Sequence, residues 1–441
     1  MNSMKIKVFC MIVLFLAGNN IGFSQGIKQQ EEKTPMSETM VWMGNERGMK
    51  NHRILGLTLG KKGAILAFTE ARLDGSDEGP HDLVCKRSLD NGITWSSDIF
   101  IEKGDGGFWK AQGVQGKLES WANPAALTDL TNGRIFIFYV LNEGEYKGRN
   151  TQRMTHVFYR FSDDEGLTWS KRTEITDVLN TGPDGRPHVD INGQPIKNAN
   201  GFACDYLGRA FHMPGPGHGI QLDNGRLLVQ FWHRRPIGNV QADGTSVSTP
   251  IADRLYSSSA IYSDDHGQTW TKGSDTGLGH HATEARVVQL ADGTVMMNAR
   301  MHNRGRRWVA RSNDQGVTWQ EGYEEETVIP YTAVDCGLIR VQPSHQESRK
   351  TDWLLHSHPN KVDKREGLTV SLSTDGGKTW PVSKLVYAYG AQYSDLVQLK
   401  DGTIGLMYEK KNNHPESTLV AGISFVRFEL DWLMENMEHE K

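Results

Sequence analysis

The sequence predicts an all-β protein built from antiparallel hairpins. A motif of the form Ser-x-Asp-x-Gly-x-Thr-Trp occurs five times in the 441 residues, beginning at Ser88, Ser162, Ser263, Ser312 and Ser373. Apolar and polar residues alternate around Asp-Gly or Asn-Gly pairs, as in "ARVVQLADGTVMMNAR", which is a hairpin signal. Long helical periodicity is nearly absent. A constant motif at uneven spacing indicates one repeated supersecondary unit with connections of variable length.

The repeated motif is intelligible as turn chemistry. Its Asp side chain is expected to accept hydrogen bonds from the backbone amides of a tight turn, and its Gly supplies a positive φ. The Thr and Trp then begin the next strand, with the indole packed against a neighbouring unit. Five copies of one acid cannot all line a single active site. The boxes are therefore expected to be scaffold.

The N-terminus has the pattern of a secretory signal peptide. Lys5 and Lys7 precede an apolar run from Val8 to Ala17, and small and polar residues continue to Gln25. This predicts a cleaved signal over residues 1–25 and a secreted or periplasmic protein. The apolar run is too short to span a bilayer, and the rest of the chain contains no candidate transmembrane segment. The alternative for this stretch is a buried N-terminal helix.

Charge and cysteine content restrict the classes of partner. A net charge of −4 gives no electrostatic reason to expect nucleic acid or an anionic membrane as partner, although a local arginine cluster could still hold a small anion. Cys85, Cys204 and Cys336 remain after removal of the signal. They are widely spaced and lack metal-type pairing, so buried thiols are expected.

The repeated box is similar to the Asp box of the sialidase (neuraminidase) superfamily. That resemblance implies a six-bladed β-propeller with four antiparallel strands in each blade. The matching segments extend from about Arg53 to Glu409, so residues 26–441 are expected to form a single catalytic propeller. The stretch 170–215, rich in Gly, Pro, Asn and Asp, is expected to be a long loop between blades. Because some non-enzymes also carry the box, function must be argued from the site.

The resemblance implies three arginines that bind a carboxylate, because a sialidase holds a sugar whose anomeric carbon bears that group. They are Arg53 in "NHRILGLTL", Arg300 at the end of "TEARVVQLADGTVMMNAR", and Arg365 ahead of the last box. The first motif departs from the family pattern, with His52 in place of an aromatic residue and Leu55 in place of a proline.

The resemblance also implies an acid–base residue on a loop. In "FTEARLDGSDEGPHDL" the family's Glu-x-Arg pattern matches Glu70 and Arg72, and Asp77 follows five residues later. Asp77 would act as general acid to the leaving oxygen and then as general base to water. Asp74 and Asp82 are competitors for this role, and the spacing favours Asp77. Arg72 is expected to contact a ring hydroxyl rather than the carboxylate.

The nucleophile of sialidases is a tyrosine, because a second anion would be repelled by the carboxylate on the anomeric carbon. The family's Tyr matches Tyr393 in "GAQYSDLVQLKDG", and Glu284 would be the base that removes its proton. Glu409 in "IGLMYEKK" matches a glutamate that orients the first arginine. Segments around Asn123 and His218 also resemble sialidase segments, and no chemistry is assigned to them.

These matches predict an exo-α-sialidase that releases terminal α-ketosidically linked sialic acids from sialylated glycans with retention of configuration, without a metal or other cofactor. The nearest alternative is a glycosidase for Kdn or Kdo, which could use the same arginines and the same Tyr–Glu pair. A non-catalytic glycan-binding Asp-box propeller is a further alternative, but it would not need Asp77, Glu284 and Tyr393 together. Transfer to a sugar acceptor is not distinguished from hydrolysis by the sequence.

Overall fold

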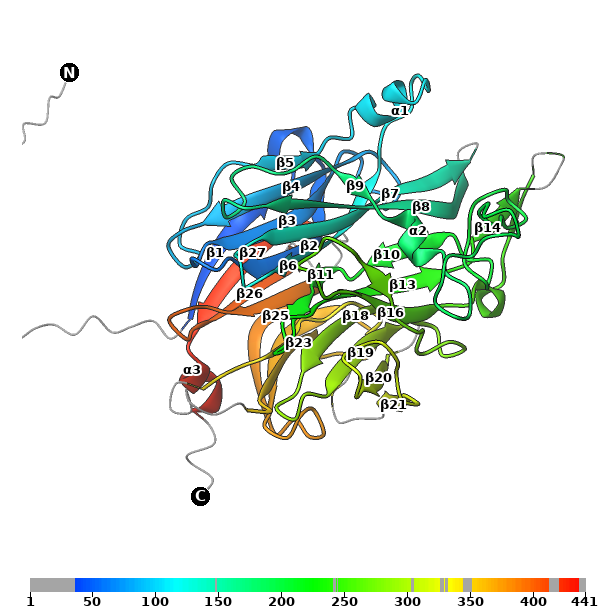
Figure 1. Ribbon diagram of the computed structural model, residues 1–441. Helices are drawn as coiled ribbons and strands as arrows, with labels where there is room; N and C mark the ends of the chain where they lie inside the picture. The colour runs from blue at the N-terminus through cyan, green and yellow to red at the C-terminus, as the bar shows by residue number, and fades with distance from the viewer. Residues whose placement is uncertain are drawn as a thin grey trace, which may run out of the picture. The chain divides into compact units, whose positions relative to one another are not determined.

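The computed structural model describes residues 36–435 except 147–148, 241–242, 244, 303–304, 326–328, 330–331, 344–350 and 412–419. The predicted signal peptide, residues 1–25, lies outside the described residues. Nearly all regular structure is β-strand (Figure 1), so the all-β prediction is confirmed. The helices of the described residues are short: η1 (Glu46–Gly48), α1 (Gly107–Ala111), α2 (Thr176–Leu179), η2 (Ile251–Arg254) and α3 (Leu430–Met434).

Antiparallel pairing joins the first strands into groups of four. The first group is β2 (Asn51–Leu59), β3 (Ile65–Arg72), β4 (His81–Ser88) and β5 (Ile99–Glu102). The second is β6 (Trp121–Thr128), β7 (Ile135–Tyr146), β8 (Arg149–Ser162) and β9 (Thr173–Glu174). The third is β10 (Phe211–Pro214), β13 (Leu227–Arg234), β16 (Ser257–Ser263) and β17 (Thr271–Lys272). The fourth is β18 (Ala282–Gln289), β19 (Val295–Met301), β20 (Arg307–Ser312) and β21 (Tyr323–Glu325).

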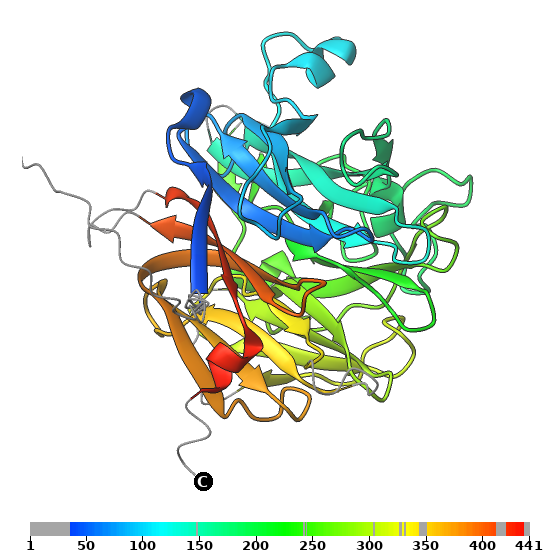
Figure 2. The same ribbon diagram turned by 90° about the vertical axis from the view of Figure 1, so that its left-hand side faces the viewer.

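A single long strand, β25 (Val382–Gln398), belongs to two further groups. Its first half pairs with β24 and its second half with β26. One group is β22 (Leu338–Arg340), β23 (Leu354–Pro359), β24 (Glu366–Ser373) and β25; the other is β25, β26 (Ile404–Lys411), β27 (Val420–Phe428) and β1 (Met36–Met43). The N-terminal strand β1 thus completes the C-terminal group, as the blue strand beside the red one in Figures 1 and 2 shows. Four short strands are added: β11 (Gly217–His218), β12 (Ile220–Gln221), β14 (Gly238–Val240) and β15 (Ser246–Ser248).

The hydrophobic core lies between successive groups. Leu66 and Phe68 of β3 pack in one cluster with Ile137 of β7, and Phe138 of β7 packs in another with Val229 of β13. Successive groups also touch along the chain, since β2 contacts β6, β8 contacts β10, β13 contacts β18, and β18 contacts β22, and the first group touches the last through β2 and β25. Segments far apart in sequence are therefore brought together where these strands meet.

The Asp boxes form turns of the predicted kind. The Asp265 carboxylate accepts hydrogen bonds from the Ser263 hydroxyl (2.7 Å), the Thr269 amide (2.9 Å) and the Thr269 hydroxyl (2.6 Å). The other four boxes repeat these bonds. Gly267 has φ 82°, and Trp270 lies edge-on to Phe138 of the preceding group at 4.9 Å between centroids. The predicted turn chemistry is confirmed, but the expectation that the Thr and Trp begin the next strand is wrong, because that strand begins after the Trp, as β17 does at Thr271.

The stretch 170–215 is not the single long loop that was expected: it contains β9, α2 and β10, and between α2 and β10 it forms an ordered ladder of turns. The amides of His188, Ile196 and Cys204 each donate a hydrogen bond to the carbonyl eight residues earlier. Within each step a tight turn is closed, for example from the Asp190 amide to the Gln194 carbonyl at 2.8 Å. Asx side chains and glycines recur at this eight-residue period, so the composition that is typical of a loop here belongs to a regular series of turns.

Two smaller expectations concern the cysteines and the membrane. Cys85, Cys204 and Cys336 are buried free thiols, as predicted. Among the described residues, no helix has the length and apolar character needed to cross a bilayer.

Candidate active site

One cavity of about 250 Å³ gathers most of the residues singled out in the sequence. Its wall includes seven of the eight predicted site residues: Arg53, Arg72, Asp77, Glu284, Arg300, Arg365 and Tyr393. The eighth, Glu409, is buried and bonded to Arg53 from behind. These residues come from β2, β3, β18, β19, β25 and β26 and from the loops before β4 and β24, so the site depends on the contacts between groups.

Irregular pairing places several of these side chains. In four antiparallel pairs the register shifts at a residue of the first strand: at Ile54 in β2 against β3, and at Asn123 in β6 against β7. It also shifts at Glu284 in β18 against β19 and at Tyr393 in β25 against β26. A β-bulge adds an unpaired residue and turns the adjacent side chains. Four strands carry this feature beside the same cavity, which explains how residues of a buried strand project into it.

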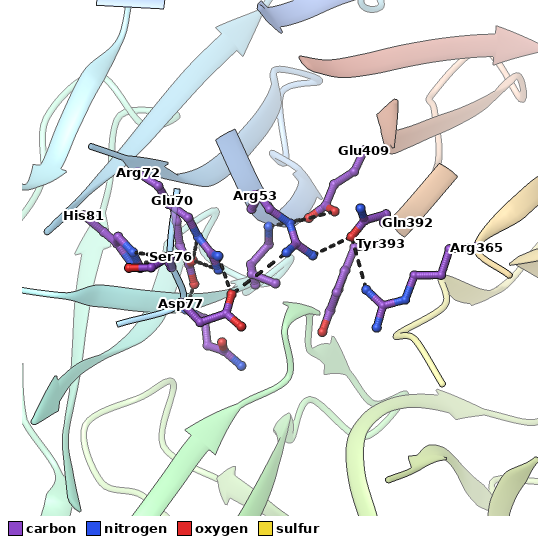
Figure 3. A network of polar contacts seen from close by, with 12 residues as sticks. Arg53, Glu70, Arg72, Ser76, Asp77, His81, Arg365, Gln392, Tyr393 and Glu409 are labelled. Carbon is purple, nitrogen blue, oxygen red and sulfur yellow. Dashed lines mark hydrogen bonds and ion pairs between the residues drawn. The ribbon is translucent and has the colours of Figure 1, made fainter. Parts of the chain in front are cut away.

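Arg53 is held by partners on β25 and β26. Its Nε donates to Glu409 Oε2 at 3.2 Å, and its Nη2 donates to Gln392 Oε1 at 2.8 Å (Figure 3). The other oxygen of Glu409 accepts the Ile54 amide at 2.6 Å, so one carboxylate fixes both the side chain and the bulge beside it. The departures from the family motif do not line the cavity: His52 stacks on Trp42 and Leu55 is in the core.

Tyr393 and Glu284 form a buried pair on the cavity wall. The Tyr393 hydroxyl donates to Glu284 Oε1 at 2.6 Å, and Arg300 Nη1 donates to Glu284 Oε2 at 2.5 Å and to the Tyr393 oxygen at 3.1 Å. Burial opposes ionisation of Glu284, but Arg300, the Tyr393 hydroxyl and Arg365 hold the pKa of Glu284 below its ordinary value. Burial and the Glu284 charge raise the pKa of Tyr393. The resting pair is therefore a neutral phenol that donates to a carboxylate.

Asp77 lies across the cavity in an ion pair with Arg72. Its carboxylate is also 3.9 Å from Arg53, and its side chain is 66% exposed. Although partial burial works in the other direction, Arg72 and Arg53 lower the pKa of Asp77 to about 2. Arg72 also donates to buried Glu70 at 2.6 and 2.8 Å. Burial raises the pKa of Glu70 to about 7 in spite of Arg72.

The two competing aspartates lie outside the cavity wall. Asp74 accepts the Ser76 amide and hydroxyl at 2.9 Å within its own turn, and Asp82 accepts the Gly104 amide at 2.8 Å. His81 donates from Nε2 to the Ser76 carbonyl at 2.8 Å, because a carbonyl oxygen can only accept. That bond ties the loop bearing Asp77 to β4 (Figure 3). Of the three candidate acids, Asp77 alone faces the cavity.

Several wall residues were not predicted. Arg234, Arg254, Trp232, Tyr256 and His302 line the same cavity. Burial lowers the pKa of Arg234 to about 9, and burial together with Arg300 lowers the pKa of His302 to about 4. These residues carry no local motif, so their position becomes apparent only when the groups pack together.

The two segments left without a chemical role have different positions. The backbone amide of Asn123 donates a hydrogen bond to Glu70 Oε1 at 2.8 Å, and Asn123 lines the cavity. His218 bonds Asp395 at 2.8 Å and is not part of the cavity wall. Among the described residues, no cluster of three or more His, Cys, Asp or Glu side chains could hold a metal ion.

The fold is similar to that of a known sialidase. The solved structure of the Hadza microbial sialidase Hz136 superimposes with a TM-score of 0.70 at 24% sequence identity, covering 90% of this chain and 69% of that one. At this identity the likeness concerns the fold.

Similar sequences include two bacterial sialidases. That of Micromonospora viridifaciens is 30% identical over 404 residues, which cover 89% of this chain and 53% of the relative. That of Bacteroides fragilis (strain YCH46) is 26% identical over 379 residues, covering 82% and 60%. The chain thus spans 53% and 60% of the length of these relatives. The profile described as BNR repeat-like domain matches residues 63–406. Because that match covers most of the sequence, the chain belongs to the BNR repeat-like family, the Asp-box superfamily that includes the sialidases.

Proposed function

We propose that this protein is an exo-α-sialidase that hydrolyses terminal α-ketosidic bonds of sialylated glycans with retention of configuration. The observation that carries the proposal is the Tyr393–Glu284 pair, bonded at 2.6 Å in a cavity that also contains Arg53, Arg300 and Arg365. A buried phenol beside a carboxylate base can attack without bringing a second full negative charge to an anionic sugar. Guanidinium groups nearby suit that sugar's carboxylate.

In the first step, the Tyr393 oxygen attacks the anomeric carbon while its proton passes to Glu284 Oε1. The bond from the anomeric carbon to the leaving oxygen breaks, and Asp77 delivers a proton to that oxygen. In the second step, Asp77 removes a proton from water, water attacks the anomeric carbon, and Tyr393 leaves with the proton held by Glu284. Two inversions at one carbon give net retention.

The acid role requires the pKa of Asp77 to rise when substrate binds. In the unliganded cavity Arg72 and Arg53 hold that pKa at about 2, so Asp77 is a carboxylate. A sugar carboxylate bound by the arginines would offset their charge and displace water, and both changes favour the protonated form of Asp77. The exposed side chain of Asp77 and its loop attachment through His81 are compatible with this adjustment.

We infer that the six four-stranded groups are the blades of a propeller over residues 26–441, supported by their ordered contacts and by the closure of the last group by β1. Residues 1–25 would direct secretion or transport to the periplasm. No cofactor is needed for the two steps above.

The experiment is a comparison of kcat/KM for fluorogenic aryl α-ketosides of Neu5Ac, Kdn and Kdo, with Tyr393→Phe as the inactive reference. A preference for the Neu5Ac ketoside supports the proposal. A preference for the Kdn or Kdo ketoside would mean that the substrate is a different sugar acid and that the proposed mechanism still applies. Absence of turnover with all three by the folded wild-type protein would favour a binding protein over an enzyme.

A further inference from the structure

Gln392 occupies a position between two of the cavity's arginines. Its Oε1 accepts hydrogen bonds from Arg53 Nη2 at 2.8 Å and from Arg365 Nη1 at 3.1 Å. Its side chain is buried and comes from the irregular stretch of β25 that also carries Tyr393. Figure 3 shows the amide group lying between the two guanidinium groups, above the phenol ring. One neutral oxygen thus holds both cations.

The three arginines differ in whether a carboxylate balances their positive charge. Arg53 pairs with Glu409 at 3.2 Å, and Arg300 pairs with Glu284 at 2.5 Å. The hydrogen bonds of Arg365 go to two neutral oxygens, Gln392 Oε1 and the Ala333 carbonyl at 2.7 Å. Within the part of the chain that the structure describes, no carboxylate forms an ion pair with Arg365. The positive charge at this end of the cavity is therefore left for a ligand.

We propose that Gln392 is a positioning residue whose neutral amide oxygen fixes Arg53 and Arg365 for an anionic ligand without cancelling their charge. A carboxylate at this position would accept the same two hydrogen bonds, but it would occupy the electrostatic place of the ligand's own carboxylate. An apolar side chain would leave the positive charge of the two arginines uncancelled, but it would no longer hold their guanidinium groups in place. The proposal rests on the proposed function only for the identity of that ligand.

The two arginines held by Gln392 also act electrostatically on the phenol of Tyr393. The guanidinium carbons of Arg53 and Arg365 lie 5.7 and 5.8 Å from the centre of the Tyr393 ring. Both cations stabilise the negative charge that the Tyr393–Glu284 pair carries. An added anion at position 392 would oppose that charge. Glu284 would then stay protonated to a higher pH, so the acid limb of the activity profile should move upward.

The test compares Gln392→Glu, which keeps an acceptor oxygen and adds charge, with Gln392→Met, which removes the oxygen and stays neutral. For an aryl Neu5Ac ketoside we expect KM to rise severalfold in Gln392→Met and by about tenfold to a hundredfold in Gln392→Glu, the range for one interaction with a charged group. The acid limb of kcat/KM should move to higher pH in Gln392→Glu only. If Gln392→Glu binds substrate as well as Gln392→Met or better, the charge argument is wrong.

A second measurement does not depend on the ligand. Because Gln392→Glu places an anion between two cations, its Tm should exceed that of the wild type at low salt, and the gain should shrink as salt is added. Gln398→Glu, on the same strand and outside the cavity wall, is the matched control and should show no such gain. A Tm of Gln392→Glu at or below that of the wild type would overturn the proposal even if the substrate were misidentified. Wild-type inactivity with a raised Tm would instead contradict the proposed function alone.

Discussion

Two of the tyrosine–glutamate pairs among the described residues have the same hydrogen-bond distance and different surroundings. Tyr393 donates to Glu284 at 2.6 Å, and Tyr139 donates to Glu102 at 2.6 Å. Both phenols are buried, and burial together with the neighbouring carboxylate raises the pKa of each. Each carboxylate also pairs with arginine. A short bond between these two residue types therefore does not by itself identify a reactive site.

The two pairs differ in whether they line the cavity and in whether a nearby arginine keeps a positive charge that no carboxylate of the described residues balances. Glu102 is matched by Arg160 and Arg172, and the pair connects β5 with β7 away from the cavity wall. The Tyr393 pair lines a cavity and lies near Arg365, whose hydrogen-bond partners are neutral oxygens. The first arrangement stabilises the contact between groups of strands. The second leaves a place for an anion next to a phenol and its base.

The largest expected effect on kcat comes from removing the phenol oxygen of Tyr393, and removal of the Tyr139 oxygen is the comparison. Tyr393→Phe cannot form the covalent intermediate, so kcat should fall on the order of a thousandfold or more on both aryl and natural sialosides. Glu284→Gln should behave in the same way, because the phenol then keeps its proton. Tyr139→Phe is the control: it should lower the free energy of unfolding and leave kcat of the folded fraction unchanged. Equal, mild losses of kcat in the two phenylalanine variants would mean that Tyr393 is not the nucleophile.

A smaller loss is expected when an arginine is exchanged for lysine. Arg300→Lys and Arg365→Lys should each reduce kcat/KM by roughly a hundredfold, about 3 kcal/mol, because an ammonium group cannot reproduce the two-pronged contact with a carboxylate. Arg172→Lys, beside the other pair, should have nearly wild-type kinetics. Steady-state kinetics on one aryl sialoside measures all three. Unchanged kinetics in Arg300→Lys or Arg365→Lys would remove that arginine from the substrate site.

Asp77 should show an effect that depends on the leaving group. An aryl leaving group departs with little protonation, so Asp77→Ala should lose at least about tenfold less activity on an aryl sialoside than on a sialyl-oligosaccharide. Asp74→Ala, on the same loop and outside the cavity wall, is the control and should not distinguish the two substrates. If Asp77→Ala loses the same factor on both substrates, Asp77 acts through the loop or through Arg72 and not as the acid.

The parts of the molecule that could be predicted are those with local causes. The box turns follow from Ser, Asp, Gly and Thr within eight residues, so the sequence sufficed to predict their hydrogen bonds. Tyr393 and Glu284 were brought together only through resemblance to a family, since they are 109 residues apart. The role of Gln392 could not be predicted, because its two partners lie on distant segments and its direction depends on a shift of register in β25. The wall residues Arg234 and Arg254 were missed for the same reason.

The Asp boxes provide a third kind of carboxylate, which is satisfied within its own turn. Asp265→Ala should lower the free energy of unfolding by about 1–3 kcal/mol, because the Thr269 amide and the Ser263 and Thr269 hydroxyls lose their acceptor. The kcat of the folded fraction should be nearly intact, since the box lies between β16 and β17 and outside the cavity wall. A large fall in kcat at unchanged stability would show that the boxes are not purely scaffold.

The stability difference should also depend on pH in a defined direction. Slight burial works the other way, but the Thr269 and Ser263 bonds lower the pKa of Asp265 from 3.8 to about 2. A carboxyl whose pKa is lower in the folded state contributes stability above its unfolded pKa and loses it as pH falls through the folded value. The gap between wild type and Asp265→Ala should therefore be constant above about pH 5 and should shrink between about pH 4 and pH 2. Urea unfolding of both proteins across this range measures the gap. A gap that stays constant down to pH 2 would mean that the ionised carboxylate does not hold the turn together.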